Sequence, residues 1–382
     1  MFNECFKDIT HKQIKAYEIS GKSVRMDSKL ISSNIAWYSR YEIIHETLLK
    51  STRDFDAKRI EDQLTREQFL EFLKEDAAKS VYRSEPKTMT QRLLSLGLVI
   101  DYILTHSKQG EFPLLSRVFQ EQYDKDKDGV VHVREKKLIS AKSVQNPHDP
   151  DAQYRSKNGK KIKGYSTNIT ETTDEKDKPS LITDIQIKGA SAADNGFVAD
   201  AIKATEEVTG NSVKVLYADG AYQSEDNREL AAAGQLEFVA NGIQGKQSRF
   251  DLNQVDESTL EVIDKQTSEV ITAIPAKPDK EGKKQWKIRL NGKDGKTTWR
   301  YFKEKHVERA VVRHKVESIP AEKRKKRNNV EATIFQYCYH TRNNKTRYRG
   351  LMKHKLQALA RGLWINMRRL LIFDEKLRAQ IA

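Results

Sequence analysis

Residues 213–220 read Val-Lys-Val-Leu-Tyr-Ala-Asp-Gly, a mostly apolar run that ends in an aspartate and a glycine. Short runs of this kind are typical of strands in the interior of a sheet. Near the start of the chain, residues 23–27 (Ser-Val-Arg-Met-Asp) form a second short strand pattern, which also closes on an aspartate. Because side chains at the carboxyl ends of strands line the functional crevice of open α/β sheets, we expect an α/β fold with Asp27 and Asp219 at that edge.

The segments around these two strands divide the chain into five parts. Residues 1–35 hold the N-terminal segment and the first strand, and residues 36–140 carry apolar side chains at the three- and four-residue spacing of helices. Residues 141–243 complete the core, with strands expected at 163–171, 180–187 and 236–240 and helices at 194–208 and 224–233. Residues 244–305 alternate in polarity, which predicts a small antiparallel β insertion, and residues 306–382 form a helical end.

Two finer expectations concern helices. Asp194 is placed to cap the helix that follows it. In the last helix, expected at 351–371, six apolar residues predict one packing face: Met352, Leu356, Leu359, Leu363, Met367 and Leu370.

The composition indicates a folded and strongly basic protein. The length of 382 residues suggests two or three domains, and 37% of the residues are hydrophobic. Lys and Arg exceed Asp and Glu by 69 − 54 = 15, which favours a polyanionic partner, because each neutralised phosphate releases counterions. Cys5 and Cys338 form neither a disulfide framework nor a zinc-ligand pattern, so a reducing cytosol is expected. The longest apolar run, residues 93–104, is broken by Asp101, so no membrane span is expected.

The closing segment concentrates this positive charge. Between Lys323 and Arg369 the chain has fourteen Lys and Arg residues and a single acidic residue, Glu331. One interpretation is a cationic helical tail in which the glutamate is incidental. The other is a phosphate-binding surface on which one carboxylate is kept to hold a metal ion at the scissile phosphate.

Three carboxylates can be combined into one such site. If the strands that end at Asp27 and Asp219 are neighbours, the two residues lie about 4.8 Å apart. That separation suits a pair of divalent ions roughly 3.5–4 Å apart. Glu331 lies at the edge of the buried stripe expected for the helix at 329–340, so it can face the same crevice. Three oxygen ligands favour Mg²⁺ (or Mn²⁺) over zinc, although aspartates after strands are common in any large protein.

Longer sequence words occur in a characteristic order. They are Met-Asp-Ser-Lys-Leu-Ile-Ser-Ser-Asn at 26–34, Asp-Pro-Asp-Ala at 149–152, Lys-Gly-Tyr at 163–165, Ala-Asp-Gly-Ala-Tyr at 218–222, Arg-Asn-Asn-Val-Glu at 327–331 and Arg-Tyr-Arg-Gly-Leu at 347–351. With these words the chain resembles, from about residue 20 to 371, the Asp-Asp-Glu transposases of bacterial insertion sequences. It resembles the type that has a β-strand insertion before the final glutamate.

The resemblance implies an RNase H-like mixed sheet flanked by helices, with a helical insertion after the first strand. It implies that Asp27, Asp219 and Glu331 are the catalytic, metal-binding triad. The implied activity is metal-dependent cleavage and strand transfer at transposon ends, with Mg²⁺ (or Mn²⁺) as cofactor. The implied partners are double-stranded DNA, at transposon ends and target, and a second copy of the chain in a homodimer on DNA. A cytoplasmic, nucleoid-associated location in a bacterium follows from the same resemblance.

Several side chains are candidates for contact with DNA. We expect backbone contacts from Lys323, Arg324 and Arg327 and, further on, from Arg342, Lys345, Arg347 and Arg349, the alternative being solvated loops. In the β insertion, Trp286 and Trp299 lie beside basic residues. Packing within the small sheet is the favoured role for both, and stacking of Trp299 on unpaired bases is the alternative kept in the candidate set.

Other features keep competing hypotheses open. Only 26 residues precede Asp27, whereas relatives carry a helical DNA-binding segment there, so a catalytically decayed or repurposed DNA-binding protein is the alternative function. The β insertion has no cysteines, so no structural zinc is expected in it. Residues 124–135 match a calcium loop at every ligand position. A charged turn is nevertheless favoured there over a calcium-regulated interaction site, because residues 144–147 cut short any exiting helix and no second loop exists.

Overall fold

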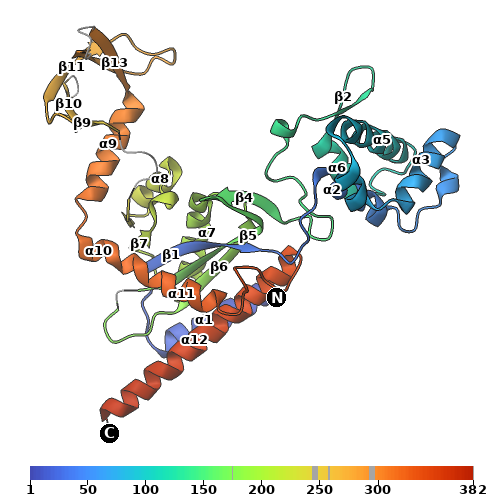
Figure 1. The fold of residues 1–382 in the computed structure, drawn as a ribbon. Coiled ribbons are helices and arrows are strands. Elements are labelled where there is room, and N and C mark those ends of the chain that lie inside the picture. The colour runs from blue at the N-terminus through green and yellow to red at the C-terminus, as the bar shows by residue number, and fades with distance from the viewer. Residues whose placement is uncertain (174, 243–247, 257–258, 292–296, 382) are drawn as a thin grey trace.

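A mixed α/β sheet flanked by helices forms the centre of the molecule (Figure 1). This computed structural model describes residues 1–173, 175–242, 248–256, 259–291 and 297–381. The strand order is β4-β5-β1-β7-β8, and β6 pairs with β5. The strands are β1 Ser23–Ser32, β4 Gln153–Lys157, β5 Lys160–Thr172, β6 Ile182–Gly189, β7 Val215–Ala218 and β8 Glu237–Ala240. β5 runs antiparallel to β1, β4 and β6, whereas β1, β7 and β8 are parallel.

The alternation of side chains along β1 gives the two faces of this sheet different partners. Val24 and Met26 pack beneath α7 (Val198–Thr209) in one apolar cluster. The side chains of Arg25, Asp27 and Ile31 lie on the other face of the sheet, which α11 (Asn329–Cys338) covers. That face is also packed by α1 (Phe2–Ala16) and α12 (Leu351–Ile381). The helix α8 (Glu225–Ala233) leads into β8.

A buried ion network joins the sheet to these helices. The carboxylate of Glu171 on β5 is fully buried and accepts hydrogen bonds from Arg25 Nε (2.6 Å), Arg369 Nη1 (2.7 Å) and Thr333 Oγ1 (2.6 Å). Burial alone would raise the pKa of Glu171, but the two guanidinium charges and the hydroxyl outweigh it and lower the pKa. Arg25, Thr333 and Arg369 come from β1, α11 and α12, so one carboxylate ties three elements together.

This network predicts a large loss of stability when its centre is neutralised. Glu171→Gln should lower the free energy of unfolding by about 3–5 kcal/mol, because two arginines then remain buried without a counter-charge. Because the folded-state pKa is lowered, the stabilisation is present above the unfolded pKa near 4.5 and is lost as the pH falls through the folded value. Urea denaturation from pH 7 downward measures both effects. Glu207→Gln, which removes an exposed ion pair with Lys7, is the control and should leave the denaturation midpoint unchanged.

The expected helical insertion follows β1 and has its own core. It contains α2 (Arg40–Ser51), α3 (Gln63–Lys74), α4 (Ala77–Arg83), α5 (Pro86–Thr105) and α6 (Pro113–Gln122). Tyr41, Phe69, Leu96 and Val118 are among the buried side chains at its centre. In Figure 1 this bundle stands apart from the sheet and is joined to it at the ends of β1 and β4.

The expected β insertion is a five-stranded antiparallel sheet. Its strands are β9 (Phe250–Gln254), β10 (Leu260–Asp264), β11 (Val270–Ala276), β12 (Gln285–Asn291) and β13 (Thr297–Lys303). Helix α9 (Glu304–Glu317) closes its core with Val307 and Ala310. Trp286 is buried in that core, so packing is confirmed for it. The predicted packing role is wrong for Trp299, because its side chain is 47% exposed. The Lys287 Nζ lies 4.6 Å from the centroid of its ring.

Three local expectations need correction. β1 continues to Ser32, so Asp27 lies in mid-strand; the apolar pattern stops there, but pairing with the long strand β5 continues through Ser28–Ser32. Asp194 does not cap a helix: it begins a short 3₁₀ turn, and its carboxylate accepts a hydrogen bond from Ser28 Oγ (2.8 Å). The predicted packing face of α12 is divided. Leu359 and Leu370 are buried, whereas Met352, Leu356 and Met367 are exposed, because the buried side of the helix is formed by Ala358, Leu359, Ile365, Asn366 and Leu370 and is rotated from the predicted face.

Two further observations complete the description. The basic run 323–327 is not a loop: α10 (Ala321–Lys325) and the 3₁₀ turn Lys326–Asn328 carry it. Among the helices in the described part of the chain, none is long and apolar enough to cross a membrane.

Candidate functional site

Asp27 and Asp219 are brought side by side by the parallel pairing of β1 and β7. Arg25 pairs with Tyr217, and the same register carried two residues further sets Asp27 opposite Asp219. Asp219 follows the last residue of β7, as expected, and its Oδ1 accepts from the Gly220 N–H at 2.7 Å. Two carboxylates one strand spacing apart are thus presented on the face that α11 covers.

Glu331 stands over β1 in the first turn of α11. Together with Asp27 it lines a groove of about 420 Å³, here called the carboxylate groove, whose other lining residues are Ser28, Lys29, Ile334, Phe335, Cys338 and Asn344. Arg327 links the two acids: its Nη2 donates to Asp27 Oδ2 at 2.7 Å, and its Nη1 lies 3.3 Å from Glu331 Oε1. Glu331 is 62% exposed, whereas Asp27 and Arg327 are mostly buried. The groove therefore has an acidic floor and an acidic rim joined by one guanidinium.

The position of Asp27 favours a nearby cation. Burial raises the pKa of Asp27, the charge of Asp219 raises it further, and the Arg327 guanidinium and the Ser28 N–H oppose the rise. Nearby, the Tyr222 hydroxyl accepts a hydrogen bond from Asn168 Nδ2 (2.7 Å). Burial is the larger cause that holds the pKa of Tyr222 well above its usual value, and the negative charge of Asp27 adds to it. The tyrosine of the Asp-Gly-Ala-Tyr word is thus buried and neutral, and it is held by Asn168 of β5.

The other sequence words meet at the far end of β1. Asp149 is fully buried and accepts hydrogen bonds from Ser33 Oγ and from the Tyr165 hydroxyl. Gly164 is needed beside them, because a Cβ there would come within 2.2 Å of the Ile31 carbonyl oxygen. The Arg349 guanidinium donates to the Asn34 carbonyl oxygen at 2.7 Å. Segments over 300 residues apart in the chain therefore fix the strand that carries Asp27.

The basic candidates lie in different environments. Arg342, Lys345, Arg347 and Arg349 are exposed on the segment that joins α11 to α12. Arg324 is half-buried, and Lys323 is held by the Glu237 carboxylate (2.5 and 2.7 Å) at the end of β8. Arg327 forms ion pairs with Asp27 and Glu331, which line the carboxylate groove. Trp299 lies in the β insertion, outside the groove.

Whether the three carboxylates suit a divalent metal depends on their donor atoms and on their arrangement. Asp27, Asp219 and Glu331 offer the oxygen ligands that Mg²⁺ and Mn²⁺ prefer, and a cation, the Arg327 guanidinium, already bridges two of them. In the arrangement described, no three acidic, His or Cys side chains of the described residues are grouped closely enough to hold a metal ion. The donor types therefore suit such a metal, whereas the described side chains are not gathered into a metal site, and Arg327 lies between Asp27 and Glu331.

This competition yields a prediction about metal affinity. Arg327→Gln should raise the affinity for Mn²⁺ in the absence of DNA by about tenfold or more, because one opposing unit charge close to two carboxylates is removed. Isothermal titration calorimetry, or the loss of the free Mn²⁺ signal in electron paramagnetic resonance, measures it. Lys323→Gln removes the same charge outside the groove and is the matched control. Equal affinities in the two variants would contradict a metal site at these carboxylates.

The calcium-like loop has a different structure. Residues Tyr123–Lys125 and Val131–Val133 pair as a β-hairpin, so no helix–loop–helix is formed. Asp126 Oδ1 accepts from the N–H groups of Asp128 and Val130 (3.0 and 2.9 Å), and Asp124 pairs with Arg134. The acidic side chains at the start of the loop, Asp124 and Asp126, thus bind other groups of the hairpin. The favoured interpretation, a charged turn, agrees with this geometry.

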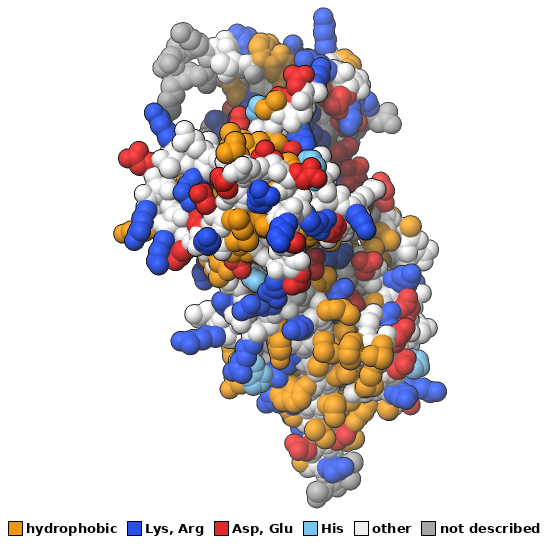
Figure 2. Space-filling model, turned by 90° about the vertical axis from the view of Figure 1, so that its right-hand side faces the viewer, with side chains coloured by type: hydrophobic (Ala, Val, Ile, Leu, Met, Phe, Trp, Pro, Cys, Tyr) orange, Lys and Arg blue, Asp and Glu red, His pale blue; other side chains and the backbone are white. Residues whose placement is uncertain are grey.

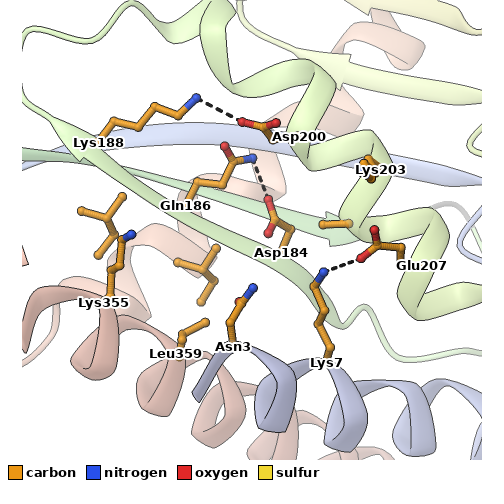
Figure 3. Close-up of a pocket in the computed structure, with 13 residues that line it drawn as sticks. Asn3, Lys7, Asp184, Gln186, Lys188, Asp200, Lys203, Glu207, Lys355 and Leu359 are labelled. Atoms are coloured by element: carbon orange, nitrogen blue, oxygen red, sulfur yellow. Dashed lines mark hydrogen bonds and ion pairs between the residues drawn. The ribbon is translucent and has the colours of Figure 1, made fainter. Parts of the chain in front are cut away.

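A second cavity lies on the other side of α12, between α1, β6 and α7 (Figure 3). It has a volume of about 450 Å³, and Asp184 lies in its wall. Its charged groups are largely paired among themselves: Lys7 with Glu207, Lys188 Nζ with Asp200 Oδ2 at 3.2 Å, and Gln186 Nε2 with Asp184 Oδ2 at 2.7 Å. Burial raises the pKa of Asp184 to about 6. These internal pairs make it a weaker candidate than the carboxylate groove.

Asp184 predicts a pH-dependent stability. Its folded-state pKa lies above the ordinary value, so its contribution to stability is present below pH 4 and is lost as the pH rises through about 6. Lys7 from α1 partly offsets this rise in pKa, and Asp200 from α7 adds to it. Asp184→Asn should therefore stabilise the protein at pH 8 by up to about 3 kcal/mol and have little effect below pH 4. Urea denaturation at both pH values, with exposed Asp8→Asn as the control, measures the difference; a stabilisation independent of pH would contradict it.

Several residues that shape the site were not anticipated. Glu171 and Arg369 hold α11 and α12 against the sheet, and Asn168 supports Tyr222. A glutamate within the predicted strand 163–171 was a signal of a buried ion pair, because its neighbours are Thr and Ile. Arg327 was assigned to the DNA backbone, and its position four residues before Glu331 was the available signal for a pair on one helix face.

Comparison with known proteins adds no relative: no family model, no curated protein and no solved structure matches this chain.

Proposed function

We propose that this protein is a metal-dependent DNA transposase that cleaves phosphodiesters and transfers strands at transposon ends. The observation that carries the proposal is the register of β1 and β7. It sets Asp27 and Asp219 side by side, and Glu331 lines the same groove as Asp27. Paired carboxylates next to unpaired cations suit a reaction in which a phosphate must be bound and its charge stabilised.

The arrangement of the sheet supports an RNase H-like core. Three antiparallel strands, β6, β5 and β1, are continued by β7 and β8, which run parallel to β1. An RNase H-like core is expected to have this order. The helical and β insertions lie after β1 and before α11, where the resemblance to insertion-sequence transposases expects them.

In this proposal Asp27, Asp219 and Glu331 hold the divalent ions. When bound, such ions activate water and stabilise the charge that develops on the scissile phosphate. Arg327, which here pairs with Asp27 and Glu331, would be free to bind a phosphate oxygen when metal neutralises these carboxylates. Exposed Arg342, Lys345, Arg347 and Arg349 bind the backbone beside the groove. The 3′-hydroxyl released by the first cleavage is then directed at target DNA in the same groove.

A second candidate is a DNA-binding protein without catalysis. The ion pairs of Arg327 with Asp27 and Glu331 favour it, since a fixed guanidinium would satisfy both carboxylates without any metal. The same basic surface would then bind duplex DNA. The two candidates differ in a single property, which is metal-dependent cleavage.

Cleavage should therefore depend on each carboxylate. Asp219→Asn should lower the rate of DNA nicking in Mg²⁺ or Mn²⁺ at least about a thousandfold, because members of one catalytic unit are lost together. Duplex binding should persist or tighten, because a carboxylate repels phosphate unless a metal neutralises it. Nicking of supercoiled plasmid and fluorescence anisotropy with a labelled duplex measure the two properties.

Asp126→Asn, in the hairpin formed by β2 (Tyr123–Lys125) and β3 (Val131–Val133), makes the same chemical change outside the groove and should leave the nicking rate unchanged. Duplex binding by both variants should weaken steeply with salt, as expected for phosphate contacts. Nicking by Asp219→Asn at the parental rate would refute the catalytic assignment. Salt-sensitive binding without any nicking by the parent chain would favour the second candidate.

A further inference from the structure

A second concave site lies beside the carboxylate groove, between α11, the segment that follows it and α12. It has a volume of about 600 Å³ and is here called the α12 pocket. Its lining residues are Tyr337, His340, Arg347, Tyr348, Lys353, Leu356, Gln357, Ala360, Arg361 and Trp364. Figure 2 shows an exposed hydrophobic area along the lower part of the molecule, where α12 runs in Figure 1, with Lys and Arg side chains at its edges.

The pocket combines an aromatic surface with cations. Trp364 is 45% exposed, and the guanidinium carbons of Arg361 and Arg368 lie 4.4 and 5.5 Å from its ring centroid. Tyr337 is buried and Tyr348 half-exposed. Arg347 and Lys353 form no ion pair with a described carboxylate, and no acidic side chain is among the lining residues that the structure describes. The charge of the pocket is therefore complementary to an anion, and its surface to a flat apolar group.

A buried polar atom also points to a ligand. Gln357 lines the pocket, and its side-chain oxygen is inaccessible to water without a hydrogen-bond partner among the described residues. An unpaired buried acceptor costs free energy, and rotation of the Gln357 amide toward the pocket would let a donor on a bound molecule recover it. Nucleobases offer such donors at their edges, and the flat ring that carries them can stack on an aromatic side chain.

We infer that the α12 pocket binds an unpaired nucleotide of a DNA strand whose cleaved end lies in the carboxylate groove. The base stacks on Trp364, Gln357 contacts its edge, and Arg347 and Lys353 bind the flanking phosphates. This inference rests on the proposed function, because it takes the same DNA as the substrate.

The two sites share elements that fix their separation. From Glu331 to Tyr337 the helix α11 advances six residues, about 9 Å along its axis. The segment after α11 contributes Asn344 to the carboxylate groove and Arg347 to the pocket. A strand crossing that distance spans about three nucleotides at 3.4 Å each. The pocket thus lies where the first unpaired nucleotides beyond the cleaved bond would pass.

The test compares a blunt duplex with the same duplex carrying a single-stranded thymidine tail. Both are measured by fluorescence anisotropy with the full chain in the Asp219→Asn background, so that the DNA stays intact. The tailed duplex should bind at least about fivefold more tightly, since stacking of one base contributes about 1 kcal/mol or more. Trp364→Ala should abolish this preference and leave the affinity for the blunt duplex unchanged.

Three further variants separate stacking from folding and test the role of Gln357. Trp364→Phe keeps an aromatic ring and should retain most of the preference. Trp37→Ala removes another exposed tryptophan with a cation over its ring and should change nothing. A 2-aminopurine base placed in the tail should lose fluorescence on binding to the parental pocket and keep it with Trp364→Ala. Gln357→Leu should flatten the differences in affinity among tails of different bases.

Each outcome has a distinct meaning. Suppose that the chain nicks DNA through its three carboxylates. If the parent chain then shows no preference for the tailed duplex, or if Trp364→Ala keeps that preference, only the pocket assignment fails. If neither duplex binds, the proposed function and the pocket assignment fail together. If Trp364→Ala converts a dimer to a monomer in sedimentation analysis without affecting the tail preference, the exposed face of α12 is a contact between copies of the chain and the assignment is overturned.

Discussion

The fully buried carboxylate of Glu171 is the interaction on which the rest of the structure depends. Arg25, which it binds, lies two residues before Asp27 on the same face of β1, and Thr333 lies two residues after Glu331 on α11. Arg369 adds the long helix α12 to the same point. A buried charge is costly unless each of its oxygens is hydrogen-bonded, so this network tolerates few other arrangements. It therefore sets the distance between the strand and the helix that carry the candidate site.

The charge balance in the groove follows from that fixed geometry. Asp27, Asp219 and Glu331 belong to a chain whose net charge is +15. Arg327 forms ion pairs with two of them, Asp27 and Glu331. Desolvation and the neighbouring Asp219 make the charged form of Asp27 unfavourable without a cation. Arg327 supplies the cation in the structure described. The proposed function assigns that place to a divalent metal and moves the guanidinium to the phosphate.

Much of the architecture could be predicted from the sequence, because periodicity and local words report local structure. The neighbouring strands of Asp27 and Asp219, the helical insertion and the antiparallel β insertion were all anticipated, and the structure has them. The extension of β1 to Ser32 was missed, because pairing with β5 overrides the polar pattern of Ser28 and Lys29. The bond from Arg327 to Asp27, the role of Asp194 and the split face of α12 were missed for a common reason: the partners are far away in sequence, and periodicity carries no information about such contacts.

The most direct test of the central claim is to locate the metal. Crystals of the chain with Mn²⁺ and a nicked DNA end would show the ion by its anomalous scattering. The account predicts a peak about 2.2 Å from oxygens of both Asp27 and Asp219, with Glu331 turned toward it and Arg327 withdrawn to a phosphate. An undisturbed Arg327 bridge between Asp27 and Glu331, with DNA bound and no Mn²⁺ peak beside either aspartate, would contradict it.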